Sequence, residues 1–200
     1  IMSGAFPISN SAFSTMGIKS IQTTIISKSD SGKKLARQID GQRFAFTADI
    51  ITAKRSDVYG ELMAFIMKQR SGKENFTIVP PEVEDARGTA SGVPHGTASA
   101  GATSITLGGS GSGTLLSGDF IKFSNHTKVY MVVADQSDIS TGTLTIEPPL
   151  TTAVSSSTIV YDNIPFTVFL TNDVQEFGAV GADKDGNVLY QYQLDVEEAL

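Results

Sequence analysis

The chain alternates hydrophobic and polar residues over several segments, with the period of two that a half-buried β-strand requires. Residues 41–50 read "GQRFAFTADI" and place four apolar side chains on one face of an extended segment: Phe44, Phe46, Ala48 and Ile50. The same alternation runs through residues 182–198, "ADKDGNVLYQYQLDVEE", where Asp185 and Gly186 match a hairpin turn. These segments predict a mainly β chain.

The first forty residues divide into two parts. Residues 1–16 are rich in serine and small residues, and their aromatic residues are Phe6 and Phe13. We expect this N-terminal arm to be loose in an isolated copy and its phenylalanines to dock on a neighbouring copy in an assembly. Residues 17–27 then place isoleucines among serines and threonines, which is typical of strands, and "KSDSGKK" at residues 28–34 predicts a turn.

One segment has helical spacing. Residues 56–72 carry apolar side chains three and four positions apart: Val58, Tyr59, Leu62, Met63, Phe65 and Ile66. Ser56 suits the N-cap, and Gly72 suits the left-handed position after the last turn. The sequence therefore predicts one α-helix, which buries its apolar face on a sheet.

The composition changes near residue 88. Residues 88–163 are low in charge and rich in glycine, serine, threonine and alanine, which favours short strands joined by wide turns. Short apolar runs predict strands at residues 119–123, 128–134 and 142–147. We interpret residues 88–163 as a small β-barrel inserted into a larger β-rich domain made of residues 17–87 and 164–200. Such an insertion costs little loop-closure entropy.

The net charge of −6 is unevenly distributed along the chain. Residues 1–87 carry 12 Lys and Arg against 9 Asp and Glu, whereas residues 165–200 carry 1 against 7. The basic first part and the acidic last part of the chain suit a head-to-tail contact, in which the basic surface of one copy meets the acidic surface of the next. The same distribution also fits two charged surfaces that only face water. The acidic total argues against a nucleic-acid-binding groove. The apolar runs fall short of the roughly 20 residues of a membrane helix.

The chemistry-bearing residues form no recognisable catalytic or metal site. The chain has no cysteine, which excludes disulfides, thiolate catalysis and cysteine-ligated zinc. Its two histidines, His95 and His126, have no partners at metal-ligand spacing, and no G-x-S-x-G elbow is present. Asn125 and His126 fall at the tip of a hairpin predicted over residues 117–135. We therefore predict no catalytic residue, no metal ligand and no cofactor.

Several phrases of the sequence, taken in order, resemble a known family. They are "GAFP" near the start, "YGELMAFIMKQRSGKENFTIVPP" from residue 59, "GDFIKFSNHTKVYMVVAD" followed by "GTLTIEPPL", and "PFTVFLTNDVQEF" from residue 165. Together they resemble distal tail proteins of long-tailed, siphovirus-like bacteriophages over most of residues 4–196.

The resemblance implies a tail-tube-like β-sandwich or barrel with one helix, carrying the inserted small barrel. Copies would form a hexameric ring that joins the tail tube to the baseplate hub and tail fibres. DNA would pass through the ring without specific binding, and part of the acidic segment 165–200 would face the bore. The protein would be made in the host cytoplasm and act in the virion, at the tail tip, with no membrane partner. The candidate interface residues are Phe6, Phe13, Asn125 and His126.

Three other interpretations stay open at this point. A tail-tube or tail-terminator subunit shares the core fold, although a long insertion disfavours it. A carbohydrate-binding module commonly presents Trp or Tyr platforms, whereas this chain has no Trp and its insertion has only Tyr130 and Tyr161. A hydrolase would need His126 in a catalytic role.

Overall fold

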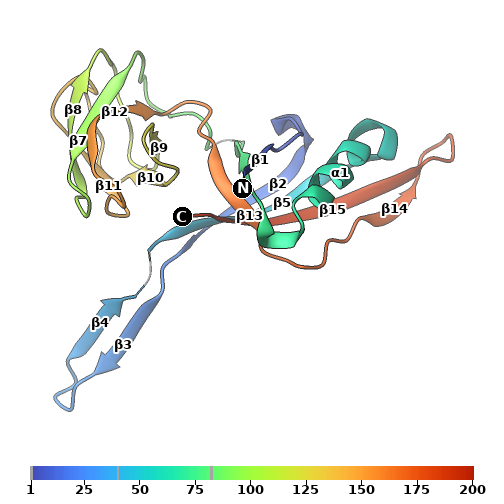
Figure 1. Ribbon diagram of the computed structural model, residues 1–200, viewed down its shortest axis with the longest axis horizontal. Coiled ribbons are helices and arrows are strands. Elements are labelled where there is room, and N and C mark those ends of the chain that lie inside the picture. The colour runs from blue at the N-terminus through green and yellow to red at the C-terminus, as the bar shows by residue number, and fades with distance from the viewer. Residues whose placement is uncertain (1, 40, 82) are drawn as a thin grey trace.

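The computed structural model describes residues 2–39, 41–81 and 83–200. Within these ranges the chain forms a seven-stranded sheet, one α-helix, a closed six-stranded barrel and a two-stranded hairpin (Figure 1). This architecture confirms the prediction of a mainly β chain with one helix that carries a small β-barrel.

The large sheet combines both ends of the chain. Its strand order is β1 (Met2–Ala5), β6 (Asn75–Ile78), β13 (Phe166–Leu170), β15 (Val188–Glu198), β5 (Arg43–Lys54) and β2 (Phe13–Ile21), with β14 (Gly178–Ala182) paired to the first half of β15. All pairs are antiparallel except β1 with β6. Residues 79–165, which contain the barrel, connect β6 to β13. Because β6 and β13 are paired, this segment leaves the large sheet and rejoins it at neighbouring strands.

One face of the large sheet holds the core, and helix α1 (Gly60–Lys68) covers it. The four residues predicted to share a face of β5 are all buried there, with Leu62 and Ile66 of the helix. A π-helical turn, Arg55–Tyr59, precedes α1, and a 3-10 turn, Ser71–Lys73, follows it. The predicted helix 56–72 is therefore too long.

The end of the helix differs from the prediction in a second way. Arg70 and Ser71 take the left-handed conformation, and Gly72 does not. Glycine is instead required at position 72 because the backbone of β13 passes close by: a Cβ atom there would lie 2.6 Å from the carbonyl oxygen of Leu170.

The prediction of a loose N-terminal arm over residues 1–16 is wrong. Of its described residues, 2–5 form β1 in the large sheet, a 3-10 turn spans Asn10–Ala12, and Phe13 begins β2. The ring of Phe6 stacks on Phe76 at 6.1 Å between centroids and meets Phe65 edge-on at 5.7 Å. These aromatic contacts anchor the arm to its own copy.

The inserted barrel closes in the order β10-β11-β8-β7-β12-β9. Its strands are β7 (Pro94–Ala98), β8 (Ser104–Gly109), β9 (Phe120–Phe123), β10 (Val129–Val132), β11 (Thr143–Glu147) and β12 (Val154–Val160). All lie within residues 88–163, and β9, β10 and β11 fall at the predicted strands. The barrel has its own core of aliphatic and aromatic side chains.

The barrel also shares a core with the large sheet, because β9 and β10 bury both of their faces. Phe123 points into the barrel, whereas Phe120 and Val129 belong to the core of the large sheet. The ring of Phe120 lies 5.3 Å from that of Phe44 and 5.9 Å from that of Phe166. The barrel is therefore packed onto the sheet by aromatic contacts.

A buried ion pair lies beside this aromatic contact. Lys128, next to β10, donates to the carboxylate of Glu198 at the end of β15, and the two side chains are 3% and 0% exposed. The Glu198 carboxylate also accepts the backbone N–H groups of Phe44, at 3.1 Å, and Val129, at 2.9 Å. Burial is the main cause of the lowered pKa of Lys128. The barrel thus supplies the positive charge and the large sheet the negative charge, and neither charge has another described ionic partner.

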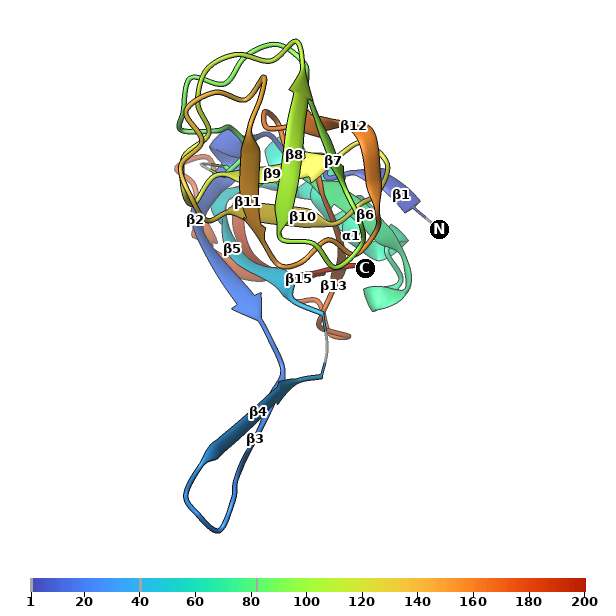
Figure 2. The same ribbon diagram turned by 90° about the vertical axis from the view of Figure 1, so that its left-hand side faces the viewer.

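A two-stranded hairpin extends away from both the barrel and the large sheet. It consists of β3 (Thr24–Lys28) and β4 (Lys34–Gln38) and continues from the end of β2 and the start of β5. Figures 1 and 2, seen from directions 90° apart, both show it projecting free of the barrel and the large sheet. Its turn lies at the predicted place, between residues 28 and 34.

Candidate assembly surfaces

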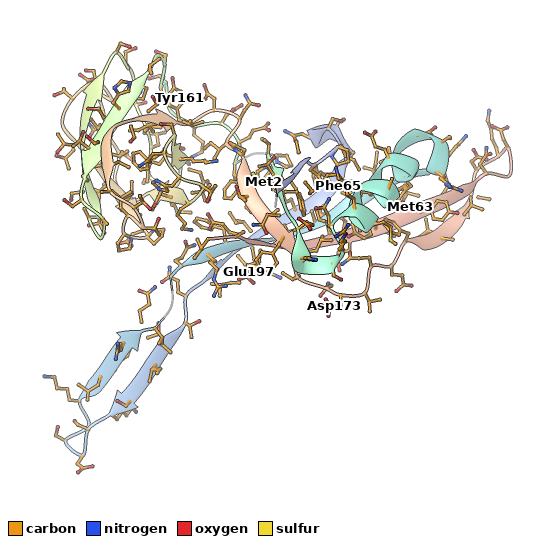
Figure 3. The ribbon with its side chains drawn as sticks, in the orientation of Figure 1. Met2, Met63, Phe65, Tyr161, Asp173 and Glu197 are labelled. Carbon is orange, nitrogen blue, oxygen red and sulfur yellow. The ribbon has the colours of Figure 1, made fainter. Side chains whose placement is uncertain are left out.

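The projecting hairpin, residues 24–38, is the most exposed apolar element of the described chain. Every residue of its two strands is exposed, and the side chains stand clear of the remaining structure (Figure 3). Ile25, Ile26 and Leu35 have exposed fractions of 55%, 58% and 52%. A two-stranded hairpin is marginally stable alone in water, so this exposed apolar surface indicates a partner that covers it.

The same hairpin is basic. It carries Lys28, Lys33, Lys34 and Arg37 against the single acidic residue Asp30, in a chain whose net charge is −6. The partner surface that suits this hairpin is therefore both apolar and acidic.

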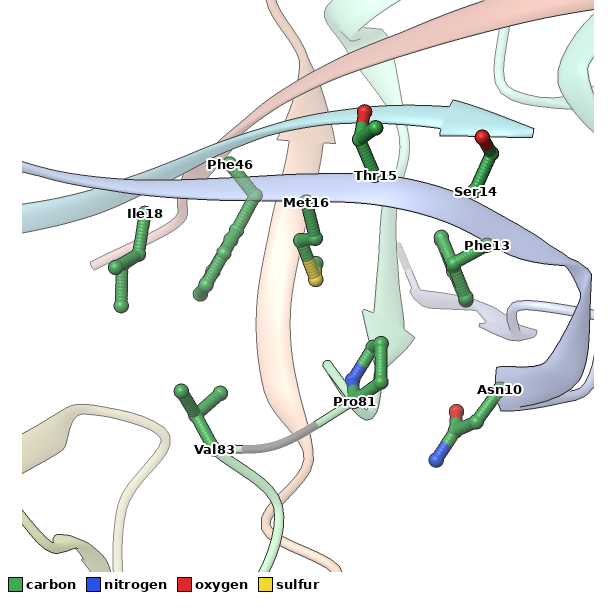
Figure 4. A pocket seen from close by; sticks show the side chains of 9 residues that line it. All are labelled: Asn10, Phe13, Ser14, Thr15, Met16, Ile18, Phe46, Pro81 and Val83. Atoms are coloured by element: carbon green, nitrogen blue, oxygen red, sulfur yellow. The ribbon is translucent and has the colours of Figure 1, made fainter.

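A groove lies along residues 13–18 of β2, and both apolar and polar side chains line it (Figure 4). This β2 groove has a volume of about 360 Å³ and is lined by Asn10, Phe13, Ser14, Thr15, Met16, Ile18, Phe46, Pro81 and Val83. Strand β2 is the last in the strand order of the large sheet, so its outer backbone edge has no described strand as a neighbour. An open edge of this kind accepts a further strand.

Acidic residues continue from the groove along the connection to the barrel. Glu84 accepts a hydrogen bond from the side chain of Asn10, which lines the groove. Asp85 follows it and accepts the backbone N–H of Asn163 at 3.0 Å. Partial burial and the charge of Asp85 raise the pKa of Asp162. Within the described chain, none of these three carboxylates forms an ion pair with a lysine or arginine.

The face of the large sheet that α1 does not cover is polar. It carries two cations, Lys19 and Arg43, and three carboxylates: Asp49, Asp195 and Glu197. Asp195 accepts hydrogen bonds from Thr47, at 2.8 Å, and from Asn172, at 3.0 Å. These bonds hold the carboxylates in fixed positions on a hydrophilic, slightly acidic surface.

At the tip of the β9–β10 hairpin, Asn125 is exposed and His126 is half-buried. The Nδ1–H of His126 donates to Asn125 Oδ1 at 2.8 Å, and its Nε2 accepts from the Tyr130 hydroxyl at 2.8 Å. Asn125 in turn donates to the carbonyl of Ala153 at 2.9 Å. Burial, followed by the charge of Lys122, lowers the pKa of His126. Because both ring nitrogens have partners, the geometry assigns His126 to shaping the turn.

The four predicted interface residues therefore lie at two separate places. Phe13 lines the β2 groove, and Phe6 packs behind it at 5.9 Å between ring centroids. Asn125 and His126 lie on the barrel. Their contacts with other chains stay predictions.

Sequence reasoning missed the projecting hairpin and the groove as surfaces. One signal for the hairpin was present: Ile25 and Ile26 are adjacent, so no strand pairing buries both on one face. The groove had no such signal, because segments far apart in the sequence form it.

Two further observations concern ligands and membranes. Over residues 2–39, 41–81 and 83–200, no group of three or more His, Cys, Asp or Glu side chains is arranged to hold a metal ion. In the same ranges, no helix combines the length and the apolar character needed to cross a bilayer.

A projecting apolar hairpin, an open sheet edge and a second domain packed onto the sheet are features of a structural assembly protein. Residues 85–164 match the family model described as distal tail protein pb9, B domain, and this segment contains the complete barrel. The match lies in the barrel, and it confirms the resemblance to phage distal tail proteins. A search of curated proteins finds no match.

Proposed function

We propose that copies of this chain form a closed hexameric ring at the distal end of a phage tail. In this ring the chain joins the tail tube to the baseplate hub and fibres and leaves a channel for DNA. The family match of the barrel supports the place in the tail. The projecting hairpin is the single observation that supports self-assembly.

The energetic reason lies in the exposed side chains of the hairpin. Full burial of an isoleucine or leucine side chain is favourable by about 1.5–3 kcal/mol. Ile25, Ile26 and Leu35 keep more than half of their surface exposed in their own copy, so an interface that covers them gains part of this free energy. A contact between the hairpin of one copy and a different patch of the next is head-to-tail, and such contacts close into rings.

The polar face of the large sheet is the surface that we assign to the bore. Its carboxylates Asp49, Asp195 and Glu197 repel the phosphates of DNA and prevent tight binding during passage. Changing all three to lysine is expected to make assembled rings retain duplex DNA on a gel. Equal retention by the wild-type rings would contradict this assignment.

The barrel then stands away from the bore. Its tip, with Asn125 and His126, is the part of the barrel that we assign to contacts with fibres or neighbouring tail proteins. In this account the protein is made in the host cytoplasm and acts in the virion. No observation on the molecule favours the carbohydrate-binding alternative.

Electron microscopy of the purified protein tests the proposal. Class averages are expected to show closed rings with a central opening and one peripheral density per copy, which corresponds to the barrel. Isolated particles at concentrations of tens of micromolar would overturn the ring.

A further inference from the structure

We propose that the inserted barrel sets the direction of the projecting hairpin of its own copy, through buried hydrogen bonds that run from Lys128 of the barrel through Gln42 to Ser20. Ser20 lies near the end of β2, where the chain leaves the large sheet for the hairpin, and Gln42 directly precedes β5, where the chain returns. Figures 1 and 2 show the hairpin leaving the large sheet on the side that carries the barrel.

The backbone ladder of the large sheet does not continue in register into the hairpin. The last pair between β2 and β5 is Ile21 with Arg43, and the first pair between β3 and β4 is Thr24 with Gln38. The chain thus advances three positions on one side of the hairpin base and five on the other. Extra residues on one strand of a pair bend it locally. The direction of the hairpin therefore depends on contacts at its base as well as on strand pairing.

Gln42 makes such contacts on two sides. Its side chain is only 3% exposed, although the hairpin beyond it is exposed throughout. Its Nε2 donates to Ser20 Oγ, across the base of the hairpin, at 3.0 Å, and its Oε1 accepts from Lys128 Nζ at 2.9 Å. One buried amide therefore joins the two sides of the hairpin base to each other and to the barrel.

Lys128 is held in place by both domains. It directly precedes β10 of the barrel, and its ammonium also donates to the carboxylate of Glu198. The same ammonium lies 4.7 Å from the centre of the Phe44 ring, and the backbone N–H of Phe44 donates to Glu198 at 3.1 Å. Since Phe44 is the second residue of β5, these contacts also fix the strand that follows Gln42.

Burial makes this arrangement demanding. A polar group that leaves its partner in a buried site loses a hydrogen bond that water does not replace. A hairpin that turned away from its present direction would draw Gln42 from Ser20 or from Lys128. Buried hydrogen-bond networks whose members are all satisfied hold a single geometry for this reason. The network of Lys128, Gln42, Ser20 and Glu198 therefore favours one direction of the hairpin as long as the barrel is docked.

The coupling acts in both directions. If the docked barrel stabilises one direction of the hairpin, holding the hairpin in that direction stabilises the docked barrel by the same free energy. In the proposed ring, a partner that binds or displaces the barrel thereby changes the geometry of the hairpin. This last consequence rests on the proposed function, whereas the coupling within one copy does not.

Distances between two spin labels test the coupling, because the chain has no cysteine of its own. Ser31→Cys places one label at the exposed turn of the hairpin, and Ser14→Cys places the other at an exposed position of β2. The protein is measured under conditions in which light scattering gives the mass of one chain, so that no neighbouring copy restrains the hairpin. With the network intact, we expect one narrow distribution of distances.

Two substitutions break the network from different sides. Lys128→Met removes the ammonium from the barrel, and Gln42→Met removes the amide while Lys128 keeps Glu198 as its partner. Each is expected to widen the distribution at least twofold. Gln42→Met gives the answer even if Lys128→Met does not fold. The matched control is Lys122→Met, since this half-buried lysine of β9 donates to the carbonyl of Pro165, at 3.4 Å, and not to the hairpin base. Its distribution is expected to stay narrow.

A second pair of labels, at Ser14→Cys and Ser155→Cys, reports the position of the barrel. We expect Gln42→Met to leave this distance unchanged, because the barrel stays docked while the hairpin loosens. An unchanged distribution of hairpin distances in Gln42→Met, or equal widening in Lys122→Met, would overturn the coupling. Either result leaves the proposed ring intact. A protein that never assembles but shows the expected widening would contradict the ring and support the coupling.

Discussion

Replacing Glu198 with glutamine removes the negative charge from the buried contact between the barrel and the large sheet. In the wild-type protein this carboxylate accepts hydrogen bonds from the Lys128 ammonium and from two backbone N–H groups, and both charged side chains are buried. Glutamine keeps the shape but leaves the Lys128 charge buried without a counter-charge. Breaking a buried pair in this way costs about 3–5 kcal/mol. That cost is a large part of the roughly 5–15 kcal/mol that holds a typical domain folded.

Urea denaturation followed by circular dichroism measures the loss. Glu198→Gln and Lys128→Met are each expected to lower the free energy of unfolding by about 3–5 kcal/mol. The double variant is expected to lose less than the sum of the two, because removing both charges leaves no uncompensated charge.

The neighbouring residue supplies the control. Glu197 pairs with Arg43 at 2.9 Å on the polar face, where both side chains are partly exposed. Glu197→Gln is therefore expected to cost no more than about 1 kcal/mol. If Glu198→Gln costs as little as Glu197→Gln, the buried pair does not stabilise the junction and the reasoning fails.

Three further predictions concern single residues. The lowered pKa of His126 means that the folded chain binds fewer protons than the unfolded chain, so the free energy of unfolding falls as pH falls from about 7 through the folded-state pKa. His126→Gln is expected to flatten that part of the pH profile, and identical profiles would refute the assignment. Gly72→Ala is expected to cost about 1–3 kcal/mol in urea unfolding, because the new Cβ meets the Leu170 carbonyl; a cost near zero would contradict the close approach. Phe120→Ala is expected to cost about 3–5 kcal/mol and to separate the unfolding of barrel and sheet in calorimetry, and one unchanged transition would show that the contact is dispensable.

The parts of the fold that the sequence predicted are those with a local cause. Alternation over residues 41–50 and 182–198 gave β5 and β15, because each strand has one buried face. Gly186 takes the positive φ that the predicted turn needs. The end of α1 was misplaced because the requirement for glycine at position 72 comes from Leu170, about a hundred residues away.

The parts that the sequence did not predict depend on distant contacts. Serine-rich composition suggested a loose arm, but the order of the arm comes from Phe6 packing on Phe65 and Phe76. The pairing of Lys128 with Glu198 joins residues 70 positions apart, and neither stands in a recognisable motif. The β2 groove likewise arises where β2 and the segment near Pro81 meet. Composition, periodicity and turn motifs describe single segments, so they do not reveal contacts between segments that are far apart in the sequence.

The mass of the purified protein in solution tests the central claim, which is that this chain assembles with copies of itself through the projecting hairpin. Light scattering is expected to give the wild-type protein six times the 21.2 kDa mass of one chain. A variant with Ile25, Ile26 and Leu35 changed to serine is expected to give the mass of a single chain, with the fold retained by circular dichroism. A wild-type protein that stays at 21.2 kDa, or a variant that assembles as well as the wild type, would contradict the account.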